Sequence, residues 1–112
     1  MDSFTIKRGD TSPVIRRSFR TETRPLVIPE GSSVVFSMAR AVGRALVVDR
    51  QRCQIIGNEV IYYWQDDDTA VAGTYISEFE ITYPDGSVET APNGGPSPQD
   101  AFIQINITPD LA

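Results

Sequence analysis

Three consecutive acids are the residues in this sequence whose types come nearest to a metal-binding or catalytic site. They are Asp66, Asp67 and Asp68, within the stretch WQDDDTAVAGTY at residues 64–75. A calcium loop spaces its oxygen ligands at alternating positions and uses a glycine for its sharp turn. That spacing is absent here, and adjacent carboxylates repel one another. A structural turn is therefore the better interpretation, and a weak cation site at residues 66–68 is the alternative that stays open.

The common kinds of catalytic chemistry lack their usual residues. The sequence has no histidine and one cysteine, Cys53, so Ser-His-Asp and Cys-His arrangements are excluded and a zinc site is implausible. No glycine-rich phosphate loop of recognised spacing occurs. We expect no catalytic residue, no metal ligand, no cofactor and no small-molecule substrate, so the chain is interpreted as a non-enzyme.

Length and composition predict one folded domain over residues 1–112. Hydrophobic residues make up 40% and aromatic residues 9% of the 112 residues, which is typical of a globular domain. No apolar run approaches the roughly 18 residues that span a bilayer. Because the net charge is −5 and no nucleic-acid motif is present, we expect neither a membrane nor a nucleic acid as a partner.

Alternation with a period of two is the main pattern along the chain, and it predicts strands. It is clearest at residues 74–83, where Tyr75, Phe79 and Ile81 share one face with Ser77. Further strands are expected at 101–107, 32–38 and 60–64, the last as a central strand, and weaker ones at 3–7, 14–20, 45–49 and 53–56. Turn residues separate them, including Gly57-Asn58 and the YPDGS turn at 83–87. The pattern favours an all-β, immunoglobulin-like antiparallel β-sandwich of about seven to nine short strands, with a small closed barrel as the alternative.

The acidic turn fits a corner of such a sandwich. Immunoglobulin-type domains carry a tyrosine whose hydroxyl bonds to backbone a few residues upstream. By this interpretation Tyr75 is that tyrosine, Asp68 bonds the backbone of its own loop, and Gly73 permits a bend. Val71 would fill the end of the sandwich, and Trp64 would pack over the core.

Charge is divided unequally between the two halves of the sequence. All ten basic residues lie in residues 1–56 with five acids, giving +5, whereas residues 57–112 hold ten acids and no basic residue, giving −10. Strands from the two halves could interleave, so that arginines face carboxylates within one domain. Alternatively, a basic face could dock on the acidic face of a neighbouring molecule in a head-to-tail contact.

The order of several motifs resembles that of a known family. FTIKRGDTSPVI opens the chain, SSVVFSMA follows, and VIYYWQDDDTAVAGTYISEFEITYPDGSVETAP precedes a closing FIQINI. This order is similar to the N-terminal domain of tailed-phage baseplate upper proteins and related phage tail proteins. The resemblance implies a non-enzymatic virion structural protein of a tail or baseplate, assembled in the host cytoplasm, whose partners are itself, as a homo-oligomer, and other phage tail proteins.

Two functional hypotheses follow, each with its own candidate residues. For a tail protein, the expected assembly contacts join the basic residues of one copy to the acidic residues of a neighbour; these residues are Arg16, Arg17, Arg20, Arg24, Asp66, Asp67, Glu78 and Glu80. The alternative is a carbohydrate or cell-surface binding module of a phage or prophage. It would use exposed aromatic residues, with Tyr63, Trp64 and Tyr83 as candidates, together with the loop at residues 91–100.

Overall fold

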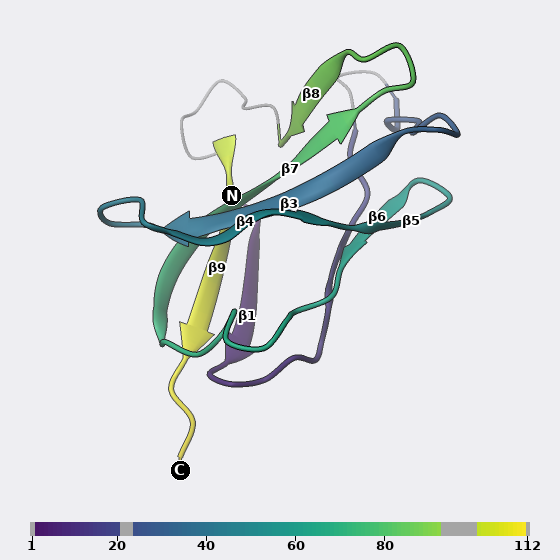
Figure 1. Cartoon of the computed structure of the whole chain (residues 1–112). Helices are drawn as coiled ribbons and strands as arrows, with labels where there is room; N and C mark the ends of the chain where they lie inside the picture. The colour runs from purple at the N-terminus through teal and green to yellow at the C-terminus, as the bar shows by residue number, and fades with distance from the viewer. Residues whose placement is uncertain (1, 21–23, 93–100, 112) are drawn as a thin grey trace.

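The computed structural model describes residues 2–20, 24–92 and 101–111. Nine strands form the framework (Figure 1), and no α-helix occurs among the described residues. The strands are β1 (Ser3–Lys7), β2 (Ile15–Arg17), β3 (Ser33–Arg40), β4 (Leu46–Arg52), β5 (Gln54–Ile56), β6 (Glu59–Tyr62), β7 (Gly73–Thr82), β8 (Val88–Ala91) and β9 (Ile103–Thr108). The predicted all-β sandwich is confirmed, and the strand number lies at the upper end of the expected range.

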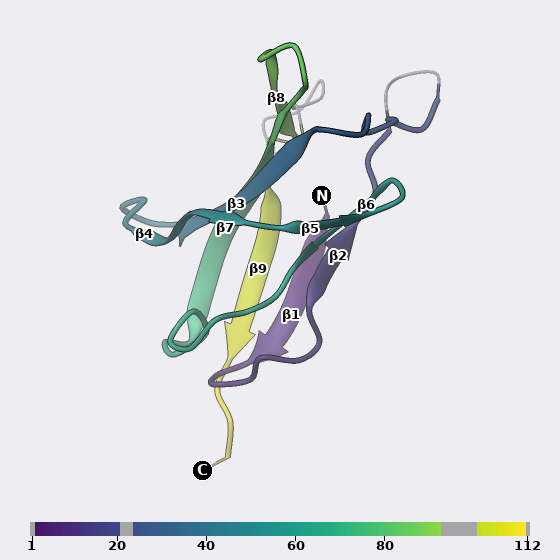
Figure 2. The ribbon, with the colours of Figure 1, turned by 45° about the vertical axis from the view of Figure 1, so that its right-hand side comes forward.

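The strands form two sheets. The larger has the order β1-β9-β7-β3-β4, with β8 paired to β7 as well, and the smaller has the order β2-β6-β5. Figure 2 shows β2, β5 and β6 gathered on one side of the larger sheet. The side of the larger sheet that faces β2, β5 and β6 is called its inner face below, and the opposite side its outer face.

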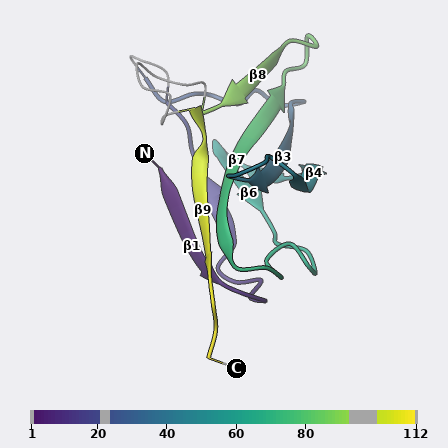
Figure 3. The same cartoon turned by 90° about the vertical axis from the view of Figure 1, so that its left-hand side faces the viewer.

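Strand β7 is the centre of the larger sheet because three strands pair with it. Its residues 73–77 pair with β9, its residues 79–82 pair with β8, and β3 pairs along the other edge. Its buried and half-buried residues alternate along its length, as expected for a strand with one dry face. Figure 3 shows β1, β9 and β7 side by side, with β8 beyond the end of β9.

The inner faces enclose a core of aromatic and β-branched side chains. Phe36 stacks on Tyr62 with ring centroids 4.4 Å apart, and it also packs against Phe79 and Trp64. Isoleucines from β9 fill the space beside these rings; they are Ile103, Ile105 and Ile107. Burying one such large apolar side chain contributes about 1.5–3 kcal/mol, so this cluster supplies the main stabilisation of the sandwich.

Two features join the sheets at their edges. Strand β4 of the larger sheet runs on into β5 of the smaller sheet through Cys53, whose backbone N–H donates to the Val34 carbonyl over 2.9 Å. The half-buried Cys53 packs against the core, and burial raises the pKa of its thiol to about 12. On the other side, the side chain of Arg17 reaches from β2 to the start of β1, as described below.

Three details of the fold differ from the expectations. Strand β1 pairs parallel with β9, so the larger sheet is mixed and not purely antiparallel. Strand β8 was not predicted as a separate strand. Val71 does not fill the end of the sandwich, because 56% of its surface is exposed; the backbone carbonyl of Val71, and not its side chain, is the group that the corner uses.

Candidate interaction surface

The corner at residues 62–75 is held by hydrogen bonds from two tyrosines. The Tyr75 hydroxyl donates to the Val71 carbonyl over 2.6 Å, which is the arrangement expected of a sandwich corner. The carboxylate of Asp68 accepts from the Gln65 backbone N–H at 2.8 Å and from the Tyr62 hydroxyl at 2.5 Å. Burial, followed by this bond to Asp68, raises the pKa of Tyr62. The bond from Tyr62 had no signal in the sequence beyond the six-residue spacing.

Gly73 supplies the backbone conformation with which β7 begins after this corner, because its φ lies in a region that favours glycine, whereas the space beside it would admit a Cβ. Its φ is +153°, and a Cβ at this position would lie 3.8 Å from the Tyr75 ring.

The remaining acids of the turn, Asp66 and Asp67, are exposed. They line a shallow polar hollow of about 400 Å³ together with Gly9 and Thr11 among others. Asp68 is committed to the corner, and the described part of the chain contains no group of three or more potential ligand side chains that could hold a metal ion.

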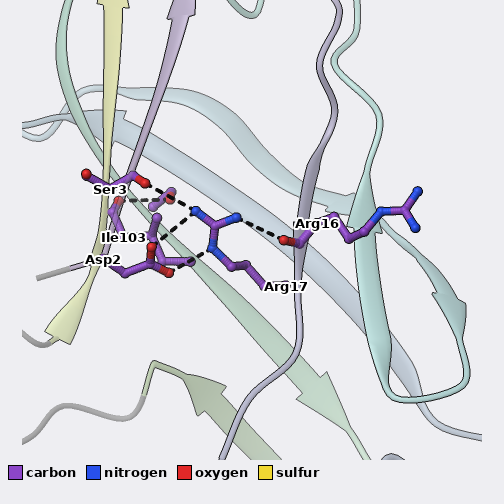
Figure 4. Close-up of polar contacts among 6 residues, drawn as sticks. Asp2, Ser3, Arg16, Arg17 and Ile103 are labelled. Atoms are coloured by element: carbon purple, nitrogen blue, oxygen red, sulfur yellow. Dashed lines mark hydrogen bonds and ion pairs between the residues drawn. The ribbon is translucent and has the colours of Figure 1, made fainter.

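Arg17, one of the predicted interface residues, bonds within its own chain (Figure 4). Its guanidinium donates to both carboxylate oxygens of Asp2, at 2.8 and 3.1 Å, and to the carbonyls of Ser3 and Arg16, at 3.3 and 2.9 Å. It also lies over the Phe4 ring, 5.9 Å from the ring centroid. Only 22% of the Arg17 side chain is exposed. This residue therefore joins β2 to β1.

The other three predicted arginines lie on β2 or in the segment that follows it. Arg16 pairs with Glu59 of the neighbouring strand β6 at 3.3 Å. Arg20 forms an isolated bridge with Pro25, and both Arg20 and Arg24 are exposed. Arg16 and Arg17 thus belong to the smaller sheet, whereas Arg20 and Arg24 lie in the segment between β2 and β3.

The predicted acidic residues are divided between two surfaces. Asp66 and Asp67 lie in the corner turn, whereas Glu78 and Glu80 lie on β7 and point to the outer face of the larger sheet. The structure therefore does not bring these four acids together on one face. Among the described residues, ion pairs instead join the basic half of the sequence to the acidic half; they include Arg8–Asp110, Arg16–Glu59 and Arg50–Glu80. Interleaved strands account for much of the charge division.

The outer face of the larger sheet carries three rows of side chains that cross β4, β3 and β7. Register places Leu46, Ala39 and Ile76 in one row, which we call the apolar row. A second row holds Arg52, Val35 and Glu80. The third row lies between these two and holds Arg50, Ser37 and Glu78. The Arg50 backbone N–H donates to the Ser37 hydroxyl at 3.1 Å, and Ser37 pairs with Glu78. Each charged row therefore runs from an arginine on β4, across a small residue on β3, to a glutamate on β7.

The apolar row forms the floor and wall of a groove of about 190 Å³. Leu46, which is 61% exposed, lies along it, and Phe102 and Arg44 also line it. The Arg44 guanidinium lies over the Phe102 ring, 5.1 Å from the centroid, a contact that is attractive because the ring face is electron-rich. The sequence analysis did not single out this groove, since its residues come from segments that lie far apart in the chain.

Two arginines of this face have an uncommon backbone conformation. Arg44 and Arg50 have φ values of +61° and +52°, in the left-handed region that costs a non-glycine residue of order 1 kcal/mol or more. Arg50 sits where the pairing of β4 with β3 shifts register, and such bulges redirect side chains. The turn and the bulge thus place both guanidinium groups over the outer face.

The aromatic residues considered for carbohydrate binding do not form a platform. Trp64 is buried, with 5% exposure, and its indole N–H donates to the Pro13 carbonyl at 3.0 Å. Tyr63 is exposed and donates to Gln54, whereas Tyr83 is half-buried and donates to Glu89. Most of the loop at 91–100 lies outside the described residues.

Comparison with known proteins gives a likeness of fold. No protein-family model and no curated protein matches the chain. Among solved structures, it is similar to CopC from Methylosinus trichosporium OB3b, with a TM-score of 0.56 and 14% identity over 100% of this chain and 89% of that one. At this identity the likeness concerns the β-sandwich alone.

The expectation of a phage structural protein is corrected by this comparison. CopC, which matches in fold, is not a tail or baseplate protein, so neither a virion structural role nor the alternative of a phage-borne binding module is retained. The motif resemblance was moderately specific because its motifs are turn and strand residues, which many sandwiches need for the same steric reasons. The resemblance itself and the predicted location stay predictions that these findings do not test.

A transition-metal centre does not fit the residues of this chain. The sequence offers no imidazole and one thiol, and these are the groups that transition metals mainly use. The raised pKa of Cys53 holds that thiol in its protonated form, which is a poor ligand. The hypothesis of a metal site is therefore not carried further. Within the described residues there is also no helix with the length and hydropathy needed to cross a bilayer.

Proposed function

We propose that this chain is a non-catalytic β-sandwich domain that binds another protein through the outer face of its larger sheet. The observation that carries the proposal is the set of three rows on that face, two charged and one apolar, beside a shallow groove. Apolar side chains that lie directly beside charged ones are common in protein-binding patches. Arginine, which often dominates binding energy, is present there, and so is Phe102, an aromatic residue of a type enriched at interfaces.

The outer face supports this function better than the other hollows do. The hollow at the corner is polar and lined by short side chains, and the groove beside Phe19 and Pro92 adjoins segments outside the described residues. The outer face, in contrast, combines an exposed leucine, a ring and both signs of charge within one register-defined patch.

Site-specific photo-crosslinking tests the proposal. A photo-reactive amino acid at position 37, in the centre of the outer face, is expected to give a covalent adduct with a protein in the cells from which the sequence comes. The same residue at position 54, on the smaller sheet, is the matched control because Gln54 is exposed and also lies in a strand. Mass spectrometry identifies the captured protein.

The two positions give opposite expectations. Specific adducts from position 37, absent from position 54, support the proposal. Adducts from position 54 alone, or none from position 37 in folded protein, would refute it.

A further inference from the structure

We infer that the partner of the outer face is a second copy of this chain, bound face to face about a two-fold axis that runs along β3. The inference rests on the proposed function, since it assigns an occupant to the same face. It is carried by the order of charge within each row, which makes the face complementary to itself.

The rows define where the axis must lie. Neighbouring strands are about 4.8 Å apart, so the arginines on β4 and the glutamates on β7 lie on opposite sides of β3 at equal spacing. Rotation by 180° about an axis along β3 places each row of one protomer opposite the same row of the second protomer. The β4 side of one protomer then faces the β7 side of the other, and each arginine meets a glutamate.

Each row is compatible with this arrangement. Arg50 of one copy faces Glu78 of the other, and Arg52 faces Glu80. The apolar row faces itself, so that Leu46 covers Ile76 of the second copy. Within the two charged rows no like charges meet. The arginine fork can bind its own and a second carboxylate at once, as the Arg50–Glu80 pair at 2.8 Å would require.

Side-chain size along the axis allows close approach. The residues that β3 contributes to the rows are Val35, Ser37 and Ala39, which are small and leave room for two sheets to stack about 10 Å apart.

The available area indicates a reversible dimer. The axis places β4, β3 and β7 in contact, because β4 is the edge strand and nothing lies opposite β9 and β1. Three strands about 4.8 Å apart, each about 25 Å long at about 3.3 Å per residue, give a contact face of roughly 350 Å². This area is below the roughly 800 Å² per partner of a standard interface. We therefore expect a weak dimer with a dissociation constant of about 0.1–0.5 mM.

Charge reversal with the purified chain tests the inference. Sedimentation equilibrium of the wild type is expected to show a monomer–dimer equilibrium. Glu78→Arg and Arg50→Glu should each weaken the dimer by about tenfold or more, because each places like charges opposite one another. Asp66→Arg, which makes the same change of charge in the exposed corner turn, is the control and should leave the dimer unchanged. Circular dichroism of each variant verifies the fold.

Mixing the two variants gives the sharpest test. In a heterodimer of Glu78→Arg with Arg50→Glu, both cross-axis contacts again join opposite charges, so native mass spectrometry should show heterodimers in large excess over either homodimer. A wild type that remains monomeric at about 1 mM, above the expected dissociation constant, would overturn the inference. So would a dimer that only Asp66→Arg weakens, or a mixture of folded variants that forms no heterodimer.

These outcomes separate the two proposals. If the wild type is monomeric but position 37 captures a different protein in cells, the outer face remains a binding surface and only the second copy is refuted. If position 37 captures nothing, the proposed function fails as well.

Discussion

At the scale of single residues, the hydroxyl groups of two tyrosines decide what the acidic turn does. Tyr75 satisfies the Val71 carbonyl, and Tyr62 gives Asp68 a second donor besides the Gln65 backbone. A carboxylate that holds its own loop in this way is a structural group. Asp68 thus differs from its two exposed neighbours although all three have the same side chain.

The first prediction concerns Tyr75. Replacing it with phenylalanine removes one hydrogen bond and keeps the buried ring, so the free energy of unfolding should fall by about 1 kcal/mol. Urea denaturation measures the change. Tyr63→Phe is the matched control, because the Tyr63 hydroxyl bonds an exposed glutamine; its effect should lie within about 0.5 kcal/mol. Equal effects for the two variants would show that the corner bond contributes nothing specific.

At the scale of elements, the two sheets of this sandwich are connected at their edges. Strand β4 passes into β5 without leaving the strand direction, and Arg17 connects the short strand β2 to the first residues of β1. Three residues of strand pair weakly by themselves, so β2 depends on such side-chain contacts. The planar guanidinium suits this position because its donors diverge toward a carboxylate and two carbonyls at once.

The second prediction tests whether Arg17 connects β2 to β1 within the chain, as opposed to binding a neighbouring molecule. Arg17→Lys keeps the charge but loses the fork, and we expect it to destabilise the fold by about 1 kcal/mol, a value reduced for the partial exposure of the pair. Arg16→Lys is the neighbouring control and should cost less than about 0.5 kcal/mol, since the Arg16–Glu59 pair is exposed. Urea denaturation provides both values. The opposite ranking would mean that Arg17 does not hold β2.

At the scale of the whole molecule, the division of charge along the sequence largely becomes pairing within the fold. The ion pairs described above between the two halves are all partly exposed, so each contributes little to stability. Besides these ion pairs, the fold sets arginines on β4 across β3 from glutamates on β7, on the outer face of the larger sheet. That alignment bears on association more than on folding, because charge across an interface mainly sets specificity and rate.

The third prediction concerns the small contribution of the ion pairs to the stability of the monomer. Raising the salt concentration from about 0.05 to about 1 M shortens the screening length to about 3 Å. The free energy of unfolding of the monomer should change by less than about 1 kcal/mol, because its ion pairs are exposed. Urea denaturation at low protein concentration provides this value. A loss several times larger would indicate that the ion pairs between the halves are essential to the fold.

Much of the fold could be predicted from the sequence because its signals are local. Alternation is visible within a single strand, and the turn at 83–87 contains its own Pro84 and Gly86. The Gly86 N–H bonds the Tyr83 carbonyl as expected. The Tyr75 corner could be predicted for the same reason, since donor and acceptor are four residues apart. Strand β8 was missed because VETA carries one glutamate and two small residues in four positions and shows little alternation of its own.

By itself, the sequence determined the all-β class, the positions of most strands and the absence of histidine-based chemistry. Tertiary structure decided which strands run parallel, that Arg17 bonds Asp2, and that Arg50 pairs with Glu80 across β3. The physical reason is that these relations depend on register between strands far apart in the chain. A shift of one residue would move every side chain to the opposite face, and only the packing of the whole core fixes that register.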